Sequence, residues 1–197
     1  NEPQWLIDRR AEAARAFAAT PMPSTQLRPW KYTDVSDLDF GAFPVAAPTG
    51  TVTGAEELVD AIAAGHPVGG EETFARLIPP TEGKFIAANT ALWEQGVTID
   101  IPAGAVTETP IVIEIESHED GAASVFPRLH IHARERAEAT IVVHLRSNGS
   151  PLLVAGVTEV YADQGAKVRL LFDNRWGADT QDYSSVRSKL GRDSDVR

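Results

Sequence analysis

The pair His130 and His132 is the sharpest candidate for chemistry in this sequence of 197 residues. Residues i and i+2 of a β-strand point to the same face, so two imidazoles at this spacing can share one metal ion. His144 lies on the next predicted strand, but no complete ligand set is evident nearby. Leu129 and Ile131 take the buried face of the same strand, which leaves both histidines on its outer, solvent side. The sequence therefore favours surface histidines over a metal site.

Glu114 and Glu116 form a second same-face pair, this time of carboxylates. Carbohydrate-active enzymes use paired acids when the surroundings push the two pKa values apart. Here the pair lies on the strand face opposite Ile111, Ile113 and Ile115, a row typical of a core. Charged residues are rarely buried without a partner, so we expect both carboxylates at the surface.

Several other kinds of site are excluded or unsupported by the residues. The chain has no cysteine, which rules out disulfides, thiolate zinc sites and cysteine nucleophiles. Residues 69–72 lack the lysine and hydroxyl of a phosphate loop, and no serine elbow is present. The formal net charge of −10 disfavours nucleic acid and anionic membranes as partners. We therefore predict no catalytic residue, no metal ligand and no enzyme activity, and we leave cofactor-binding residues unassigned.

The first 95 residues are predicted to be helical, with irregular connections. Apolar spacing predicts helices over residues 2–19, 71–77 and 84–92. A further helix is predicted to begin at a capping box formed by Thr53 and Glu56 and to end at Gly65. We expect residues 24–43 to be pinned onto a core by four rings, those of Trp30, Tyr32, Phe40 and Phe43. The Pro, Ala, Thr and Gly composition of residues 44–53 predicts a mobile loop.

The hydrophobic period changes at Gly96 from helical to strand spacing. Alternating apolar residues predict strands over 97–101, 111–116, 128–132, 141–146, 167–173 and 183–190. The turns around Gly104, Ala137 and Gly165 recur after 33 and 28 residues, a period found in solenoids. Strands about ten residues apart also suit a sandwich or jelly roll. We favour a β-helix, with a helical domain over residues 1–95 and the first part of a β-helix core over 96–197.

Four segments resemble, in order, the SufB/SufD family of iron–sulfur cluster assembly proteins. The Pro-Trp-Lys-Tyr-Thr-Asp-Val motif at residues 29–35 is similar to a motif of the SufD branch. The other three segments are residues 5–13 with 21–24, residues 84–93 continuing through Gly96-Val97 to Ile101-Pro102, and Pro127-Arg128-Leu129 with Glu138-Ala139.

The resemblance implies a mainly β protein in which a helical N-terminal region precedes a right-handed parallel β-helix. It also implies a scaffold subunit that acts through its partners SufB and the ATPase SufC, with the iron–sulfur cluster handled by the full complex. The positions that match the family here, such as Trp30, Tyr32, Asn89 and Trp93, are interpreted as structural. The absence of a long apolar run and of a signal pattern makes a cytoplasmic location the default.

Family members continue well beyond the length of this chain, so the resemblance also implies an N-terminal portion that lacks the SufC-docking region. The last predicted strand, residues 183–190, is followed by no recognisable cap. Uncapped solenoid ends recruit other chains, which predicts self-association as a two-fold dimer. Two alternatives remain open at this point: a carbohydrate-active β-helix enzyme that uses surface carboxylates, and a purely structural β-solenoid.

Overall fold

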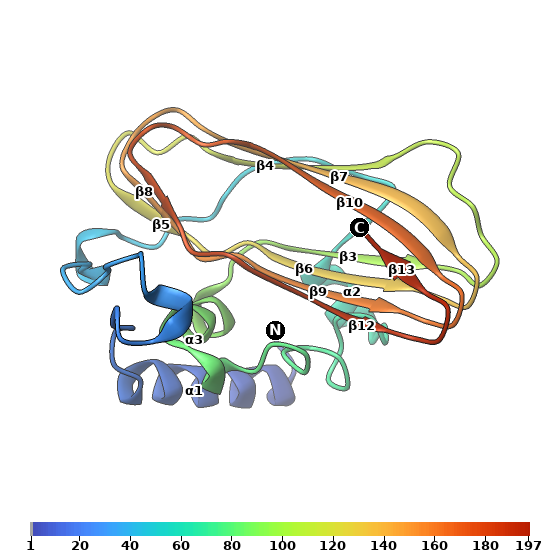
Figure 1. Ribbon diagram of the computed structural model, residues 1–197, viewed down its shortest axis with the longest axis horizontal. Helices are drawn as coiled ribbons and strands as arrows, with labels where there is room; N and C mark the ends of the chain where they lie inside the picture. Colours follow the sequence, from blue (N-terminus) through green and yellow to red (C-terminus); the bar gives the residue numbers. More distant parts are fainter. Residues whose placement is uncertain (1) are drawn as a thin grey trace.

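The computed structural model describes residues 2–197, and it places a helical layer against one side of a β-helix (Figure 1). The helices are α1 (Gln4–Ala19), α2 (Leu58–Ala64) and α3 (Lys84–Leu92), with short 3-10 turns η1 (Arg28–Trp30), η2 (Phe40–Ala42) and η3 (Pro80–Glu82). Among the described residues, no helix combines the length and apolar character needed to cross a membrane.

The β-helix has three sheets, each built from successive coils. The first sheet contains β2 (Glu56–Glu57), β3 (Gly96–Ile101), β6 (Arg128–Ala133), β9 (Val157–Ala162) and β12 (Ser185–Leu190). The second contains β1 (Val52–Thr53), β4 (Ile111–Ser117), β7 (Glu138–Ser147), β10 (Lys167–Arg175) and β13 (Asp195–Val196). The third and shortest contains β5 (Ala123–Val125), β8 (Leu152–Val154) and β11 (Thr180–Asp182).

Parallel pairing between coils decides the architecture in favour of the β-helix. Strands β3, β6, β9 and β12 pair side by side in parallel, and Ile99, Ile131, Val160 and Ser188 occupy equivalent positions. Successive coils are thus 32, 29 and 28 residues long, close to the spacing of the predicted turns. No helix lies after Leu92 in the described chain, so the predicted change from helix to strand at Gly96 is confirmed.

The alternation in each strand fills the interior of the coils with aliphatic side chains. Ile111, Ile113 and Ile115 of β4 are buried, and they pack in one cluster with Ile141 and Val143 of β7. Each such side chain stabilises the fold by about 1.5–3 kcal/mol when it leaves water. Stacking equivalent aliphatic residues in consecutive coils therefore explains why this local pattern specifies a solenoid.

Residues 44–53 correct the expectation of a mobile loop, because they run along the edge of the first coil. The Ala46 N–H donates to the Ser124 carbonyl at 2.9 Å, and the Thr49 N–H donates to the Glu116 carbonyl at 2.8 Å. Val52 then pairs antiparallel with Ile113. The segment covers backbone groups that would otherwise form an open sheet edge, which is why a stretch of loop-like composition is hydrogen-bonded.

Two helix predictions in the N-terminal region were wrong in detail. Helix α2 begins at Leu58 with Glu57 as N-cap and no side-chain capping bond, so Thr53 and Glu56 do not form a capping box. The predicted stop is confirmed, since Gly65 is left-handed with φ of 73°. Residues 71–77 form turns instead of a helix. Their backbone N–H groups are used in a tertiary contact with Glu159, described below.

The four rings expected to pin residues 24–43 onto a core divide into three that pack against it, those of Trp30, Phe40 and Phe43, and one exposed ring, that of Tyr32. Trp30 stacks on Phe85 with ring centroids 5.4 Å apart, and it lies 5.8 Å from the ring of Tyr183 on the last coil. Phe40 also contacts Phe85, at 5.5 Å. Tyr32 is 90% exposed, so its interpretation as a structural anchor was wrong.

Candidate functional site

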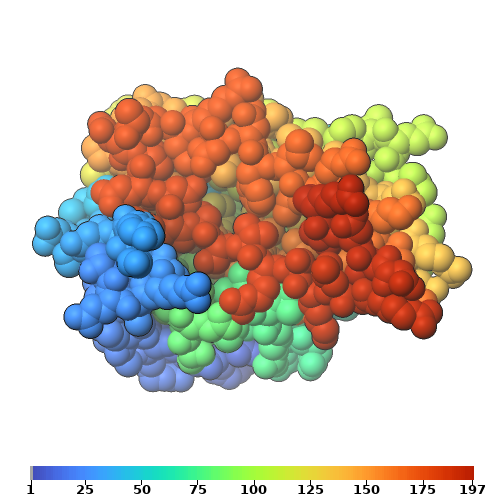
Figure 2. All heavy atoms as spheres, in the orientation of Figure 1, coloured from blue at the N-terminus to red at the C-terminus, as the bar shows by residue number. Residues whose placement is uncertain are grey.

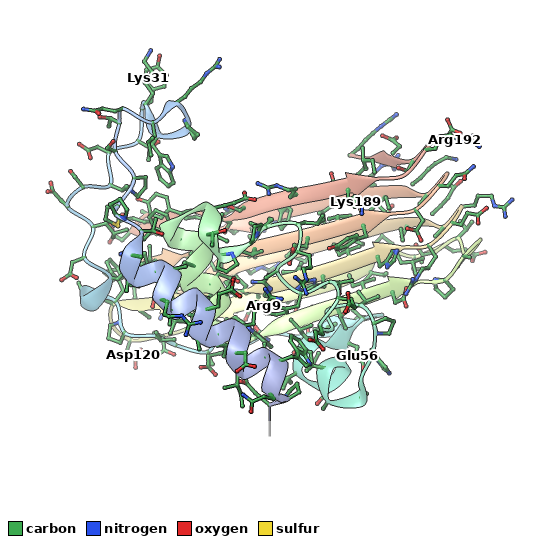
Figure 3. All side chains as sticks on the ribbon, turned by 90° about the horizontal axis from the view of Figure 1, so that it is seen from below. Arg9, Lys31, Glu56, Asp120, Lys189 and Arg192 are labelled. Carbon is green, nitrogen blue, oxygen red and sulfur yellow. The ribbon has the colours of Figure 1, made fainter. Side chains whose placement is uncertain are left out.

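The interface between the helical region and the β-helix contains a buried polar cluster. Arg128 and His130 on β6 and Glu159 on β9 point away from the coil interior, yet their side chains are fully buried. The expectation that His130 lies on the solvent side is therefore corrected. Its side of the strand was predicted, but the N-terminal region covers that face of the sheet, as the view from below shows (Figure 3).

Arg128 is the centre of this cluster, and each of its three nitrogens has a partner. One Nη donates to Glu159 at 2.8 Å, and the other donates to Asn89 Oδ1 at 2.8 Å and to Thr90 Oγ1 at 3.2 Å. The Nε donates to His130 Nε2 at 3.1 Å. A fully buried guanidinium needs such a set, because an unpaired buried charge is strongly destabilising.

Glu159 binds the loop that precedes η3 through both carboxylate oxygens. It accepts the backbone N–H of Leu77 at 2.7 Å and those of Ala75 and Ile78 at 3.1 Å. Burial by itself raises the pKa of Glu159, but the positive charge of Arg128 and the loop N–H groups outweigh it and lower the pKa. The ionised carboxylate thus holds residues 71–77, which were predicted to form a helix, in a turn conformation.

His130 is held in its neutral form by the same surroundings. Burial lowers its pKa to about 3, the attraction of Glu159 opposes that shift, and the charge of Arg128 adds to it. Because Nε2 accepts the Arg128 bond, the ring proton lies on Nδ1, which has no hydrogen-bond partner in the described chain. The ring stacks on Phe74 at 5.4 Å, so the cluster is closed by an aromatic side chain.

This arrangement links two parts of the chain. Asn89 of α3 extends the link, since its Nδ2 donates to the carbonyls of Pro127 at 3.0 Å and Ala155 at 2.8 Å. The cluster therefore joins α3 and the loop before η3 to consecutive coils. Its side chains have no solvent access in this structure.

The structure does not bring the three predicted histidines together. His132 lies beside Asp163 at 3.1 Å, whereas His144 lies on a different sheet and contacts Asp173 at 2.9 Å. Within residues 2–197, no group of three His, Asp or Glu side chains is arranged to hold a metal ion.

Glu114 and Glu116 lie on the outer face of β4, as their alternation predicted. Glu114 accepts a hydrogen bond from Thr51 Oγ1 at 2.9 Å, and Glu116 contacts His118 Nε2 at 2.8 Å. Arg146 of the next coil lies 3.9 Å from Glu116. Each carboxylate thus has its own polar partner at the surface.

A groove of about 600 Å³ lies between residues 20–33, the start of α3 and the last coil. Its walls include Pro23, Trp30, Phe85, Tyr183 and Arg187. Figure 2 shows residues 20–33 (blue) and the last coil (red) on the same face of the molecule. The groove is mainly apolar, and its volume lies within the range of sites that bind small molecules.

The pairing of Arg128 with Glu159 was not predicted from the sequence. The available signal is a charged residue inside an apolar run: Glu159 interrupts Val157, Thr158 and Val160. Charged side chains at such positions are rarely buried without a partner, so each predicts an opposite charge on a neighbouring element. The sequence alone does not say which of its cations is that partner.

Comparison with known proteins finds a family model that matches most of the β-helical part. Residues 114–197 match the sequence model of the SUF system FeS cluster assembly SufBD core domain. The chain is also similar to the iron–sulfur cluster assembly protein SufB of Bacillus subtilis (strain 168), at 27% identity over 122 residues. That match covers 59% of this chain and 25% of the relative, so the chain spans about a quarter of the length of the relative it matches.

Proposed function

Because its β-helical part belongs to the SufB/SufD family of iron–sulfur cluster assembly proteins, we propose that this chain is part of a SufD-like assembly subunit of the SUF system. In this proposal it acts by binding other proteins and not as an enzyme. SufB and SufC are the proposed partners, and the iron–sulfur cluster is cargo that the assembled complex handles.

The observation that carries the proposal is the solenoid of residues 114–197 that matches the SufBD core. The residue types of this part of the chain support a structural role in the assembly. Iron–sulfur clusters are held mainly by cysteine thiolates, and the sequence contains no cysteine. The buried polar cluster around Arg128 is closed to solvent and ties the helical region to the coils, as expected for a rigid scaffold.

Assignment to the SufD branch depends on the motif at residues 29–35, since the relative that matches is a SufB. Within that motif, Trp30 is the anchor between α3 and the last coil, and Tyr32 is free for contact with another molecule.

Complementation distinguishes the two branches. The open reading frame that encodes this sequence is expressed in two bacterial strains that depend on the SUF system, one without SufD and one without SufB. We expect growth to be restored in the strain without SufD and not in the other. Restoration of the strain without SufB alone would assign the chain to the other branch, and restoration of neither would oppose the proposal.

A further inference from the structure

One row of outward side chains crosses the first sheet from coil to coil. Thr98 of β3, His130 of β6, Glu159 of β9 and Arg187 of β12 occupy equivalent positions, because their strands pair in parallel register. Neighbouring strands lie side by side, so this row runs along the axis of the solenoid and across the strands. It lies on the face of the sheet that the N-terminal region covers (Figure 3).

Each member of the row contacts one segment, residues 66–83, which we call the strap. In the first coil, Thr98 Oγ1 donates to the Val68 carbonyl at 3.1 Å. In the second coil, the ring of His130 stacks on that of Phe74 at 5.4 Å. The contacts therefore follow the order of the coils as the strap proceeds along the chain.

The third and fourth coils continue this order. Glu159 in the third coil accepts the three N–H groups of the strap described above, between residues 75 and 78. Arg187 in the fourth coil donates to the Leu77 carbonyl and to the carboxylate of Glu82. One segment is thus held by the same position of four successive coils.

The strap is attached to the coils by side chains alone. Within the described chain, its backbone hydrogen bonds run inside the strap or to the adjoining helices α2 and α3. Every hydrogen bond between the strap and a strand of the first sheet involves a side chain of that strand. The strands themselves are joined by ladders of backbone bonds. A segment outside those ladders opens at a lower free energy than the core does.

Glycines bound the strap, and prolines stiffen it. Gly65 ends α2 in the left-handed region with φ of 73°, and Gly83 precedes α3. Glycine has the widest backbone freedom, so the chain can turn at both positions. Between them, Pro67, Pro79 and Pro80 each fix one backbone dihedral angle. The sequence therefore favours motion of the strap as one body between two joints.

Phe74 is the largest side chain that the strap buries. Its ring lies 5.8 Å from those of Trp5 and Trp93 and stacks on His130. Removal of the strap from the sheet must withdraw this ring and break the bonds to Thr98 and Glu159. The contacts of the strap are therefore made and lost together.

We propose that the strap is a conformational device that docks on the first sheet and releases from it as one unit, while the coils stay folded. Release uncovers the row and one side of the Arg128–Glu159 pair. In a simple solenoid each coil contacts only its neighbours, whereas a shared strap couples the first coil to the third and fourth. This inference goes beyond the proposed function, since it concerns motion within residues 5–187 and not the partners of the protein.

Native-state hydrogen exchange measures the opening of the strap. The protein encoded by the full open reading frame is exchanged in deuterated buffer and analysed by mass spectrometry at the resolution of single residues. The N–H groups of Ala75, Leu77 and Ile78 should share one opening free energy. That value should be lower than the value for the N–H groups of Ile131 and Val143, which lie in the core of the coils.

Variants test the coupling between coils. Thr98→Val removes one bond in the first coil and keeps the shape of the side chain. Exchange at Leu77 and Ile78, which are held by the third coil, should become about fivefold faster, the effect of one lost hydrogen bond. Thr98→Ser keeps the donor and should restore the native rate. Asp100→Asn is the matched control, because Asp100 lies on the same face of β3 but binds Arg134 instead of the strap.

The outcomes decide between a moving strap and a fixed one. Equal opening free energies for the strap and the core would overturn the proposal, because the strap would then open only when the whole protein unfolds. Unchanged exchange at Leu77 in Thr98→Val would overturn it too, as would equal acceleration by Asp100→Asn. Faster exchange in the core of the Thr98→Val variant by the same factor would show that the coils are destabilised, which also contradicts a strap that moves alone.

Discussion

Replacing Glu159 with Gln removes one negative charge from the interior and keeps the size of the side chain. In the native chain, Glu159 accepts the N–H groups of Ala75, Leu77 and Ile78 and one bond from Arg128. Glutamine has a single acceptor oxygen, and its amide nitrogen is a donor. At least one of the native donors would then face another donor, and the buried cation of Arg128 would lose its counter-charge.

The expected loss in the free energy of unfolding is about 3–5 kcal/mol, the cost of breaking a buried ion pair by removing one partner. Glu138→Gln is the matched control, because Glu138 pairs with Lys167 across neighbouring coils at 2.6 Å but both side chains are exposed. Exposed pairs contribute about 0–1 kcal/mol. Because only the Glu159 pair is buried, the two Glu→Gln substitutions should differ by several kcal/mol in their effect on the free energy of unfolding.

Urea denaturation followed by tryptophan fluorescence measures this difference. Trp93 and Trp30 report the helical region, while circular dichroism near 218 nm follows the coils. With a urea slope of about 2 kcal/mol per molar, the Glu159→Gln midpoint should fall by roughly 1.5–2.5 M. The reasoning is refuted if the two variants shift the midpoint equally, or if Glu159→Gln costs less than about 1 kcal/mol.

Two further predictions concern the same interface. Folding holds the pKa of His130 at about 3, below its value in the unfolded chain, so its contribution to stability is present above pH 6.5 and is lost as the pH falls toward 3. The native chain should therefore lose about 1.4 kcal/mol per pH unit more than His130→Gln over this window, measured by urea titrations at a series of pH values, and parallel profiles would contradict the assignment. Trp30→Ala should lower the free energy of unfolding by about 2–3 kcal/mol, because the stacking on Phe85 is lost. Tyr32→Ser should change it by no more than about 0.5 kcal/mol, because Tyr32 is exposed. Thermal unfolding of both variants checks this, and an equal loss would show that Tyr32 is an anchor.

The strands could be predicted from the sequence because their signal is local. Alternation of residues such as Ile113 and Glu114 sets which side chain enters the core, and the near-constant coil length follows from the turns. The same alternation of apolar and polar residues fits parallel and antiparallel strands. The structure was therefore needed to choose between a β-helix and a jelly roll.

The polar cluster could not be predicted, because its partners are far apart in the chain. Residues 71–77 have helix-forming composition, but Glu159, more than 80 residues later, captures the N–H groups of Ala75 and Leu77. His130 was placed on the correct side of its strand, yet local periodicity does not show that another part of the chain covers that side. Tertiary contacts outweigh local preference at both places.

Affinity purification from the native host tests the central claim most directly. The protein encoded by the full open reading frame is tagged at its chromosomal position, purified under anaerobic conditions, and its partners are identified by mass spectrometry. Assembly in the SUF system predicts that SufB and SufC co-purify in stable proportion, and that both are absent from a mock purification of the untagged strain. Recovery of the tagged protein alone, or cleavage of polysaccharides by the purified protein, would contradict a role as an assembly subunit.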